Sequence, residues 1–202
     1  MRDANIAACN FVKSKVNLPN LTFVQDDAWN ITKYGKFDAV FCCGLLYHLD
    51  RPNEFLRLLS SVTRKAMILQ THFATGGHSP NAALQVFRKA QQFLAKITGS
   101  PPTRDIQNHL SPLCENEGLI GRWYIEFPSD SSFAERSISR WASWNNRRSF
   151  WIQREYLLQA IRDAGFGLIL EQFDSLAPNI ADSMQTGYYR AEQRGTFLGI
   201  KT

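Results

Sequence analysis

Residues 37–49 read FDAVFCCGLLYHL, and this stretch decides the fold. Its first half contains the uninterrupted apolar run AVFCC, which is typical of a strand buried on both faces inside a parallel sheet. Gly44 ends the run, and the polar pair Tyr47 and His48 follows within one helical turn. Because ligands of open α/β sheets bind outside the carboxyl ends of the strands, the sequence predicts a site between Cys43 and His48.

The segments around this strand alternate between helical and extended patterns. Apolar spacing and Gly or Pro punctuation predict helices over 1–16, 50–62 and 153–164 and strands over 21–24, 66–69, 167–170 and 196–200. Gly165 is expected in the left-handed conformation just past the end of the third helix. Alternating helices and strands favour right-handed βαβ units and a mostly parallel sheet, so the predicted fold class is α/β and Rossmann-like.

The middle of the chain, residues 74–148, breaks this alternation. It begins with an amphipathic pattern that predicts a helix over 81–98 and continues as an irregular segment rich in Trp, Tyr and Phe. We interpret it as an aromatic-rich helical insertion, or substrate lid, on the carboxyl edge of the sheet. The whole chain, 1–202, is then a single domain of ordinary size.

The composition is that of an ordinary globular chain with no export signal. Hydrophobic residues make up 44% and charged residues 20% of the 202 positions, and the formal net charge of +5 permits an anionic ligand or nucleic acid without requiring one. The four cysteines show no C-x-x-C spacing, which argues against a disulfide framework or a zinc cluster. A polar N-terminus and the lack of an apolar run of about 18 residues predict a cytoplasmic protein with no membrane partner.

Five segments together resemble the class I S-adenosylmethionine-dependent methyltransferases. They are similar to the family's third, fourth and fifth strands, its late helix with the sixth strand, and its seventh strand: LTFVQDDAWNI (21–31), KFDAVFCCGLLYHL (36–49), AMILQTHF (66–73), SFWIQREYLLQAIRDAGFGLILEQ (149–172) and RGTFLGIK (194–201). The resemblance covers most of the chain outside residues 74–148. It implies the family's α/β fold, a hairpin-forming seventh strand and S-adenosylmethionine as the cofactor.

The chain departs from this family at its N-terminus. The family holds its cofactor with a Gly-rich loop after strand one and an acidic residue after strand two, whereas no glycine precedes Gly35 here. We therefore expect an N-terminally truncated fragment that begins on the helix after strand two and has impaired methyl transfer. Without strand one, the strand at 37–43 would have a raw edge, so we expect the chain alone to aggregate or dimerise there.

The resemblance assigns cofactor contacts to four residues. Asp27, with Ala28 beside it, would accept a hydrogen bond from the adenine amino group; from the residues alone, Asp26 and Asp27 are more simply explained as turn residues. The backbone of Cys43 and Gly44 would lie along the sulfonium and methionine portion of the cofactor. We expect the Cys43 thiol itself to be buried and inert, because no Lys, Arg or His adjoins it in sequence.

His48 is the candidate catalytic residue. An imidazole at the mouth of the site can take a proton from an oxygen or nitrogen acceptor, while proximity and orientation supply much of the rate of methyl transfer. The alternative is a histidine that only packs on Tyr47 and bonds a backbone group. His72 and His78 match no standard zinc spacing, so we expect no metal and interpret them as loop or substrate-pocket residues.

Three functions stay open on the sequence. Methyl transfer to an unidentified small-molecule acceptor is favoured. A non-catalytic, degenerate methyltransferase-like module would explain the missing Gly-rich loop. A tRNA-modifying enzyme would explain the cations and rings interleaved over 140–151, RWASWNNRRSFW, which we otherwise interpret as part of a lid.

Overall fold

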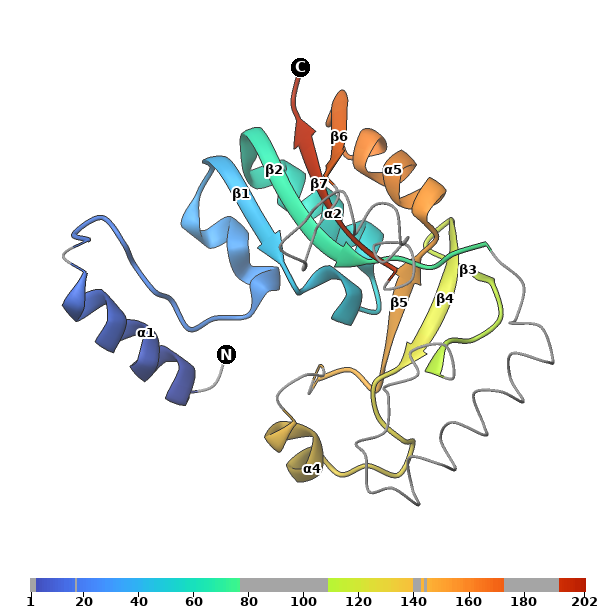
Figure 1. Ribbon diagram of the computed structural model, residues 1–202, viewed down its shortest axis with the longest axis horizontal. Helices are drawn as coiled ribbons and strands as arrows, with labels where there is room; N and C mark the ends of the chain where they lie inside the picture. The colour runs from blue at the N-terminus through green and yellow to red at the C-terminus, as the bar shows by residue number, and fades with distance from the viewer. Residues whose placement is uncertain (1–2, 17, 77–108, 140–142, 144, 173–192) are drawn as a thin grey trace, which may run out of the picture.

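The computed structural model describes residues 3–16, 18–76, 109–139, 143, 145–172 and 193–202 (Figure 1). The helices are α1 (Asp3–Lys15), α2 (Pro52–Val62), α4 (Phe133–Ile138) and α5 (Arg154–Asp163), with 3-10 helices η1 (Ala28–Tyr34) and η2 (Leu46–His48). The strands are β1 (Phe37–Cys43), β2 (Thr63–His72), β3 (Cys114–Asn116), β4 (Leu119–Ile125), β5 (Arg148–Ile152), β6 (Leu168–Gln172) and β7 (Arg194–Ile200). The helices predicted around residues 1–16, 50–62 and 153–164 are confirmed, whereas the helix predicted over 81–98 lies outside the described residues.

The larger sheet has four strands in the order β1-β2-β7-β6 (Figure 1). β1 and β2 are parallel, whereas β7 runs antiparallel to both of its neighbours, β2 and β6. The predicted antiparallel pairing of the last two strands is therefore confirmed. Because β1 and β2 are parallel and joined through α2, their carboxyl ends, at Cys43 and His72, lie at the same edge of the sheet.

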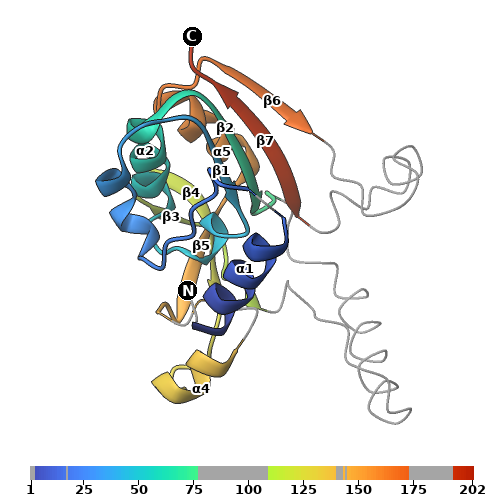
Figure 2. The same ribbon diagram turned by 90° about the vertical axis from the view of Figure 1, so that its left-hand side faces the viewer.

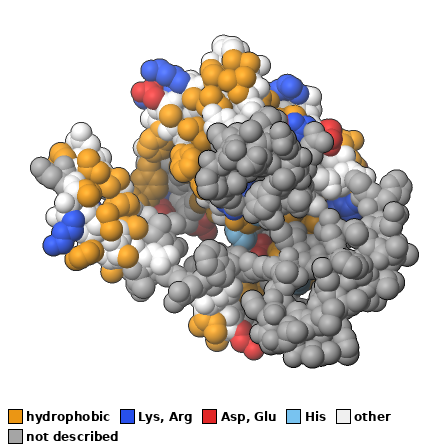
Figure 3. Space-filling view, viewed as in Figure 1, with side chains coloured by type: hydrophobic (Ala, Val, Ile, Leu, Met, Phe, Trp, Pro, Cys, Tyr) orange, Lys and Arg blue, Asp and Glu red, His pale blue; other side chains and the backbone are white. Residues whose placement is uncertain are grey.

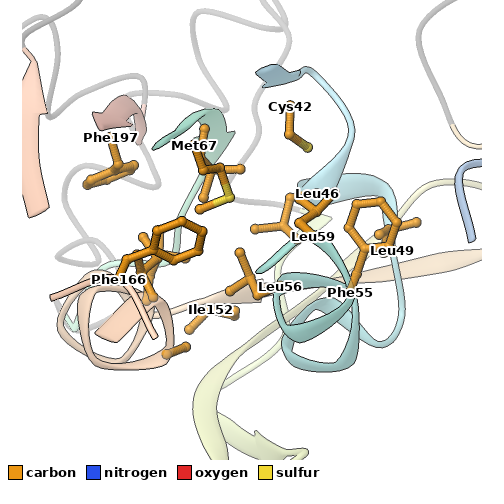
Figure 4. Packing of buried hydrophobic residues seen from close by; sticks show 14 of the residues in the cluster. Cys42, Leu46, Leu49, Phe55, Leu56, Leu59, Met67, Ile152, Phe166 and Phe197 are labelled. Atoms are coloured by element: carbon orange, nitrogen blue, oxygen red, sulfur yellow. The ribbon is translucent and has the colours of Figure 1, made fainter. Parts of the chain in front are cut away.

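Helices α2 and α5 bury one face of this sheet (Figure 2). In α2, Phe55, Leu56 and Leu59 recur at helical spacing and are at most 2% exposed. They pack into the same cluster as Met67 of β2 (Figure 4). Burying a side chain of this size stabilises a fold by roughly 1.5–3 kcal/mol, so this face anchors the sheet.

The other face of the sheet is exposed, which corrects the prediction that the strand at 37–43 is buried on both sides. In β1, Val40 and Cys42 are buried, whereas Phe41 between them is 69% exposed. Phe41 is in register with Ile68 of β2, which is in register with Leu198 of β7, so apolar side chains form a row across this face. The alternation of buried and exposed residues is that of a sheet with one covered face.

The N-terminal segment contains the predicted helix but not the predicted strand. Phe11 and Val12 of α1 are exposed, and hydrophobic side chains gather over α1 and over β1 in the space-filling view (Figure 3). Residues 21–24 form no strand, which corrects the prediction made for them. A strand is stable only where a neighbouring strand completes its hydrogen bonds, and no described strand pairs with this segment.

A smaller antiparallel sheet, β3-β4-β5, lies near the carboxyl edge of the larger one (Figure 1). β3, β4 and α4 come from the region predicted to be irregular, so the described part of that region is more regular than its sequence indicates. Phe150 N donates to Leu49 O at 2.8 Å, and Ala74 N donates to Ile152 O at 2.9 Å. The segments that follow β1 and β2 are therefore both hydrogen-bonded to β5. Within the described ranges, no helix has the length and apolar character needed to cross a membrane.

Candidate active site

The turn after β1 leads directly to the candidate catalytic residue. Gly44 has a φ of +69°, in the left-handed region that favours glycine, and its N–H donates to Gln70 O at 3.2 Å. The chain then forms η2, in which Leu46 is buried in the core. His48 ends this short helix, so the segment between Cys43 and His48 has a defined backbone at the carboxyl end of the sheet.

His48 pairs with an acidic residue that follows β4. Its Nδ1 lies 2.7 Å from Glu126 Oε1, and the His48 side chain is 18% exposed. Its other ring nitrogen, Nε2, makes no hydrogen bond within the described part of the chain and is not among the fully buried unpartnered atoms found there, so it retains some exposure to solvent. The arrangement has one nitrogen held by a carboxylate and the other free to meet a ligand.

Glu126 is the residue of the candidate site that sequence reasoning missed. Its side chain is only 2% exposed, and Oε1 also accepts a hydrogen bond from Ser149 Oγ at 2.8 Å. A buried carboxylate is costly unless such donors satisfy it, and here both donors reach the same oxygen. Glu126 lies 78 positions from His48, and no local motif marks it, so only the folded chain brings the two together.

The backbone around His48 is held by side chains from and next to β5. Asn146 Nδ2 donates to His48 O at 3.0 Å, and Trp151 Nε1 donates to Tyr47 O at 3.0 Å. Together with the Phe150–Leu49 backbone bond, these contacts satisfy three successive carbonyls. These hydrogen bonds from β5 and the residues beside it therefore fix the position of η2.

Aromatic rings form a stack beside His48. The Trp151 ring lies between His72 and Tyr124, with ring centroids 4.7 Å from each and interplanar angles of 12° and 9°. Tyr47 contacts His72 edge-on at 4.6 Å and His48 at 4.2 Å. The packing of His48 on Tyr47 that the sequence offered as an alternative is present, and the contact of Nδ1 with Glu126 accompanies it.

Cys43 differs from the expectation for its thiol. The residue is exposed rather than buried, and Sγ donates to Gln70 Oε1 at 2.7 Å. The same amide oxygen accepts a hydrogen bond from Arg194 Nη2 at 2.7 Å. Neighbouring Cys42 points to the covered face, where burial raises the pKa of its thiol to about 12. Successive strand residues face opposite sides, so the exposed face of β1 carries Cys43 and the core carries Cys42.

The two adjacent acids before η1 have different roles. Asp26 accepts hydrogen bonds from Tyr34 Oη at 2.6 Å, Asn30 Nδ2 at 2.7 Å and the Asp27 N–H at 2.8 Å. These bonds, the Tyr34 one first, lower the pKa of Asp26 to about 2. Asp27 caps η1, because its Oδ1 accepts from Trp29 N at 3.1 Å, and its Oδ2 has no partner in the described residues.

Trp29 and Ala28 lie in the first turn of η1, partly buried against the core. The Trp29 ring meets Phe55 edge-on at 5.0 Å, and the Arg51 guanidinium lies 4.8 Å from its centroid. Asp27 and Ala28 therefore sit at the start of a short helix that is fixed to α2. The turn role predicted from the residues alone is confirmed for Asp26, and Asp27 combines a capping role with an open carboxylate oxygen.

The basic and aromatic stretch at 140–151 is only partly described, because residues 140–142 and 144 lie outside the described ranges. Arg148 places its guanidinium 4.1 Å from the Trp123 ring centroid, and Arg147 Nη2 donates to Ser131 O at 3.5 Å. Both arginines are exposed. His78 also lies outside the described ranges, and the described residues contain no group of three or more side chains suited to hold a metal ion.

Solved structures share this fold. The chain matches the N-terminal domain of EvdMO1 with SAH bound, with a TM-score of 0.61, 18% identity and coverage of 100% of this chain and 62% of that one. It matches the same domain in the presence of SAH and D-fucose with a TM-score of 0.61, 20% identity and coverage of 100% and 64%. The predicted α/β class is confirmed, whereas the prediction of a mostly parallel sheet is wrong for the described strands, because only β1 and β2 pair in parallel. The chain has the fold of the class I S-adenosylmethionine-dependent methyltransferases.

The chain also matches magnesium protoporphyrin IX methyltransferase (ChlM) from Synechocystis PCC 6803 with bound SAH, with a lower TM-score of 0.46. The identity is 16%, and the match covers 96% of this chain and 58% of that one. No family model matches the sequence, and no curated protein matches it. The chain spans somewhat less than two thirds of the length of the EvdMO1 domain structures that it matches.

Proposed function

We propose that the protein transfers a methyl group from S-adenosylmethionine to a small-molecule acceptor. The observation that carries this proposal is the His48–Glu126 pair, with its 2.7 Å contact, at the carboxyl end of β1 on a class I methyltransferase fold. Ligands of open α/β sheets bind at this edge. The SAH bound to the EvdMO1 domain supports the choice of cofactor.

The residues at this edge suit such a cofactor. Asp27 Oδ2, which has no partner in the described residues, would accept a hydrogen bond from the adenine amino group beside Ala28. A Cβ added at Gly44 would meet only Tyr47 Oη, at 3.8 Å, so the backbone of Cys43 and Gly44 can be approached closely by the sulfonium portion. When bound, S-adenosylmethionine supplies an activated methyl group on a positively charged sulfur and leaves as S-adenosylhomocysteine.

The chain's own groups prepare the acceptor. His48 Nε2 would take the acceptor's proton, because that nitrogen retains some exposure to solvent while Nδ1 is held by Glu126. The rings of Tyr47 and Trp151 form one wall beside it. A wall of aromatic rings excludes water and restricts the acceptor's orientation, and orientation supplies much of the rate in a displacement at carbon.

Binding of S-adenosylhomocysteine tests this function and the role of Asp27 together. We expect titration of the product into isotope-labelled protein to shift the amide resonances of Ala28 and Gly44. The Asp27→Ser variant should bind about tenfold more weakly, since serine keeps the helix cap but lacks the carboxylate that accepts the adenine hydrogen bond.

The matched control is Asp38→Ser in β1. It removes an exposed carboxylate, whose Oδ1 lies 3.6 Å from Lys65 Nζ, and it should leave the affinity for S-adenosylhomocysteine unchanged. Amide shifts detect binding even in the millimolar range, so weak binding is still seen. Wild-type resonances that stay fixed at saturating product would overturn the proposed cofactor.

A non-catalytic module that keeps the methyltransferase-like sheet is the second candidate. The apolar row on the uncovered face supports it, because Phe41 is 69%, Ile68 38% and Leu170 47% exposed. Such a surface is typical of a site that contacts another chain. Protein that binds no S-adenosylhomocysteine yet keeps its fold would favour this candidate.

A further inference from the structure

We propose that Glu126 is a positioning residue that holds His48 in one tautomer, so that Nε2 acts as a base and the methyl acceptor is an oxygen or nitrogen group that carries a proton. This inference rests on the proposed function. It assigns a role to Glu126 that the sequence did not indicate, and it narrows the class of acceptor from any small molecule to one whose oxygen or nitrogen must lose a proton.

The first step concerns where the ring proton lies. Glu126 Oε1 accepts a hydrogen bond from Ser149 Oγ at 2.8 Å and faces His48 Nδ1 at 2.7 Å. An ionised carboxylate can only accept hydrogen bonds, so Nδ1 must carry the hydrogen. In a neutral imidazole one nitrogen is a donor and the other an acceptor, and Nε2 therefore keeps its lone pair.

The second step concerns the charge that faces the ring. Glu126 is 2% exposed and forms no ion pair with a lysine or arginine in the described part of the chain. Its partners are the Ser149 hydroxyl and the His48 ring. The negative charge therefore acts on His48 from a site with little water, where it is screened weakly. It stabilises the positive ring that forms when Nε2 takes up a proton, as the acid does in a serine hydrolase triad.

The third step concerns the direction of Nε2. Asn146 holds the His48 carbonyl at 3.0 Å, and the Tyr47 ring packs against the imidazole with centroids 4.2 Å apart. The backbone, one ring face and Nδ1 are thus fixed by three different neighbours. Nε2 is left as the free end, and it retains some exposure to solvent. A base must be within hydrogen-bond reach of the proton that it abstracts, and this nitrogen meets that condition for a group entering the site.

The chemistry of the acceptor follows from a base with a free lone pair. A carboxylate has already lost its proton near neutral pH and needs no base, whereas an amine, like a hydroxyl, must lose a proton to accept the methyl group. A hydroxyl keeps its proton there, since even a phenol has a pKa near 10, so transfer to its oxygen gains from a nearby imidazole. The proton would leave the acceptor's oxygen or nitrogen for Nε2 as that atom forms its new bond to the methyl carbon and the bond from that carbon to the cofactor sulfur breaks, and it would later pass from Nε2 to solvent. If Nε2 carried the hydrogen instead, His48 would be a donor, and it would suit an acceptor that is already anionic.

The experiment reads the tautomer of His48 directly. Long-range proton–nitrogen correlation spectra of nitrogen-15-labelled protein at neutral pH distinguish the two tautomers, and His48→Gln identifies the resonances of this ring. We expect the Nδ1–H form in the wild type. Glu126→Met, which has nearly the same length but no acceptor, should lose that form, and Glu126→Gln, which keeps an acceptor oxygen, should retain it.

The control variant is Glu115→Gln, which removes an exposed carboxylate from β3 in the same small sheet and should leave the His48 spectrum unchanged. The Glu126→Gln protein keeps the polar contacts of the site, so it provides a folded comparison if Glu126→Met does not fold. Wild-type protein in the Nε2–H form, or a tautomer that is the same in Glu126→Met and the wild type, would overturn the inference.

The same samples separate this inference from the proposed function. If S-adenosylhomocysteine shifts the amides of Ala28 and Gly44 while His48 is in the Nε2–H form, the inference alone fails. If the product shifts no resonance while the Nδ1–H form is present and depends on Glu126, the proposed cofactor fails and the ring geometry stands.

Discussion

The two sides of the candidate site are built in different ways. On the acceptor side, η2 is held by residues up to 104 positions away, through Trp151, Asn146 and Glu126. On the proposed cofactor side, Asp26 is held by partners within eight positions, Asn30 and Tyr34, and both contacts are exposed. The acceptor side therefore depends on the tertiary fold, whereas on the proposed cofactor side the turn at Asp26 is local and only the following helix η1 is fixed to α2, through Trp29.

This difference predicts that a core substitution in β5 lowers the free energy of unfolding more than a substitution in the turn at Asp26. Phe150 is 1% exposed and packs edge-on against Trp123 at 5.1 Å, next to the strand residues that hold η2. We expect Phe150→Ala to lower the free energy of unfolding by about 3–5 kcal/mol, because it leaves a cavity in the cluster that joins the two sheets. Urea denaturation followed by circular dichroism measures this change.

The control for that variant is Phe133→Ala in α4, where the side chain is 57% exposed. Its free energy of unfolding should differ from the wild type by no more than about 0.5 kcal/mol, the usual range for a surface position. A loss below about 1 kcal/mol in Phe150→Ala would mean that the acceptor side does not depend on this packing.

The open face of β1 and its edge, which pairs with no described strand, predict self-association of the chain, an effect of intermediate size. Among the described strands β1 pairs with β2 alone, and Phe41 on its uncovered face is 69% exposed. We expect the chain to self-associate at this strand, and Phe41→Lys to weaken the association by about tenfold, since edge and surface charges oppose strand-to-strand pairing. Light scattering over a concentration series measures the association constant.

Lys65 on the neighbouring strand offers a charge-conserving control, because its side chain is 75% exposed and Lys65→Arg changes neither charge nor apolar surface. A wild-type chain that stays monomeric at all concentrations and melts cooperatively would contradict the expected association. That result would mean that the apolar row is tolerated as ordinary surface.

The same difference explains which features the sequence could predict. Helix α2 and the strands near 66–69 and 196–200 follow from local apolar patterns, and the positive φ of Gly165 follows from its position after α5. Pairing partners do not follow from local patterns. Residues 21–24 have a strand-like composition, but they form no strand, because no described neighbour completes their hydrogen bonds.

The candidate site divides in the same way. His48, Gly44 and Asp27 could be located because each follows or precedes a recognisable element. Glu126 could not, because its role depends on the pairing of β4 with β5, which brings Ser149 and the end of β4 beside η2. The burial of Cys42 rather than Cys43 depends on which face of the sheet is covered, and an apolar run without polar residues does not reveal this.

The smallest effect is expected at the turn formed by Asp26. Lowering the pH there should weaken the hydrogen bonds that Asp26 accepts and so destabilise η1 without affecting η2. The pKa of Asp26 lies at about 2 against an ordinary value of 3.8, chiefly because Tyr34 donates a hydrogen bond to the ionised carboxylate. A carboxyl whose pKa is lower in the folded state stabilises the fold above its ordinary pKa. That contribution is lost as the pH falls from about 4 to about 2.

The protection factors of the Asn30 and Trp29 amides, which compare their exchange rates with the intrinsic rates at each pH, should therefore fall over that interval, and in Asp26→Asn they should be low at every pH. Glu115→Gln is the control, because this acid is exposed and lies in β3, away from η1. Because the turn is local, the amides of η2 should keep their protection in both variants. If η2 lost protection together with η1, the two sides of the site would be coupled, and the contrast between a tertiary acceptor side and a local cofactor side would be wrong.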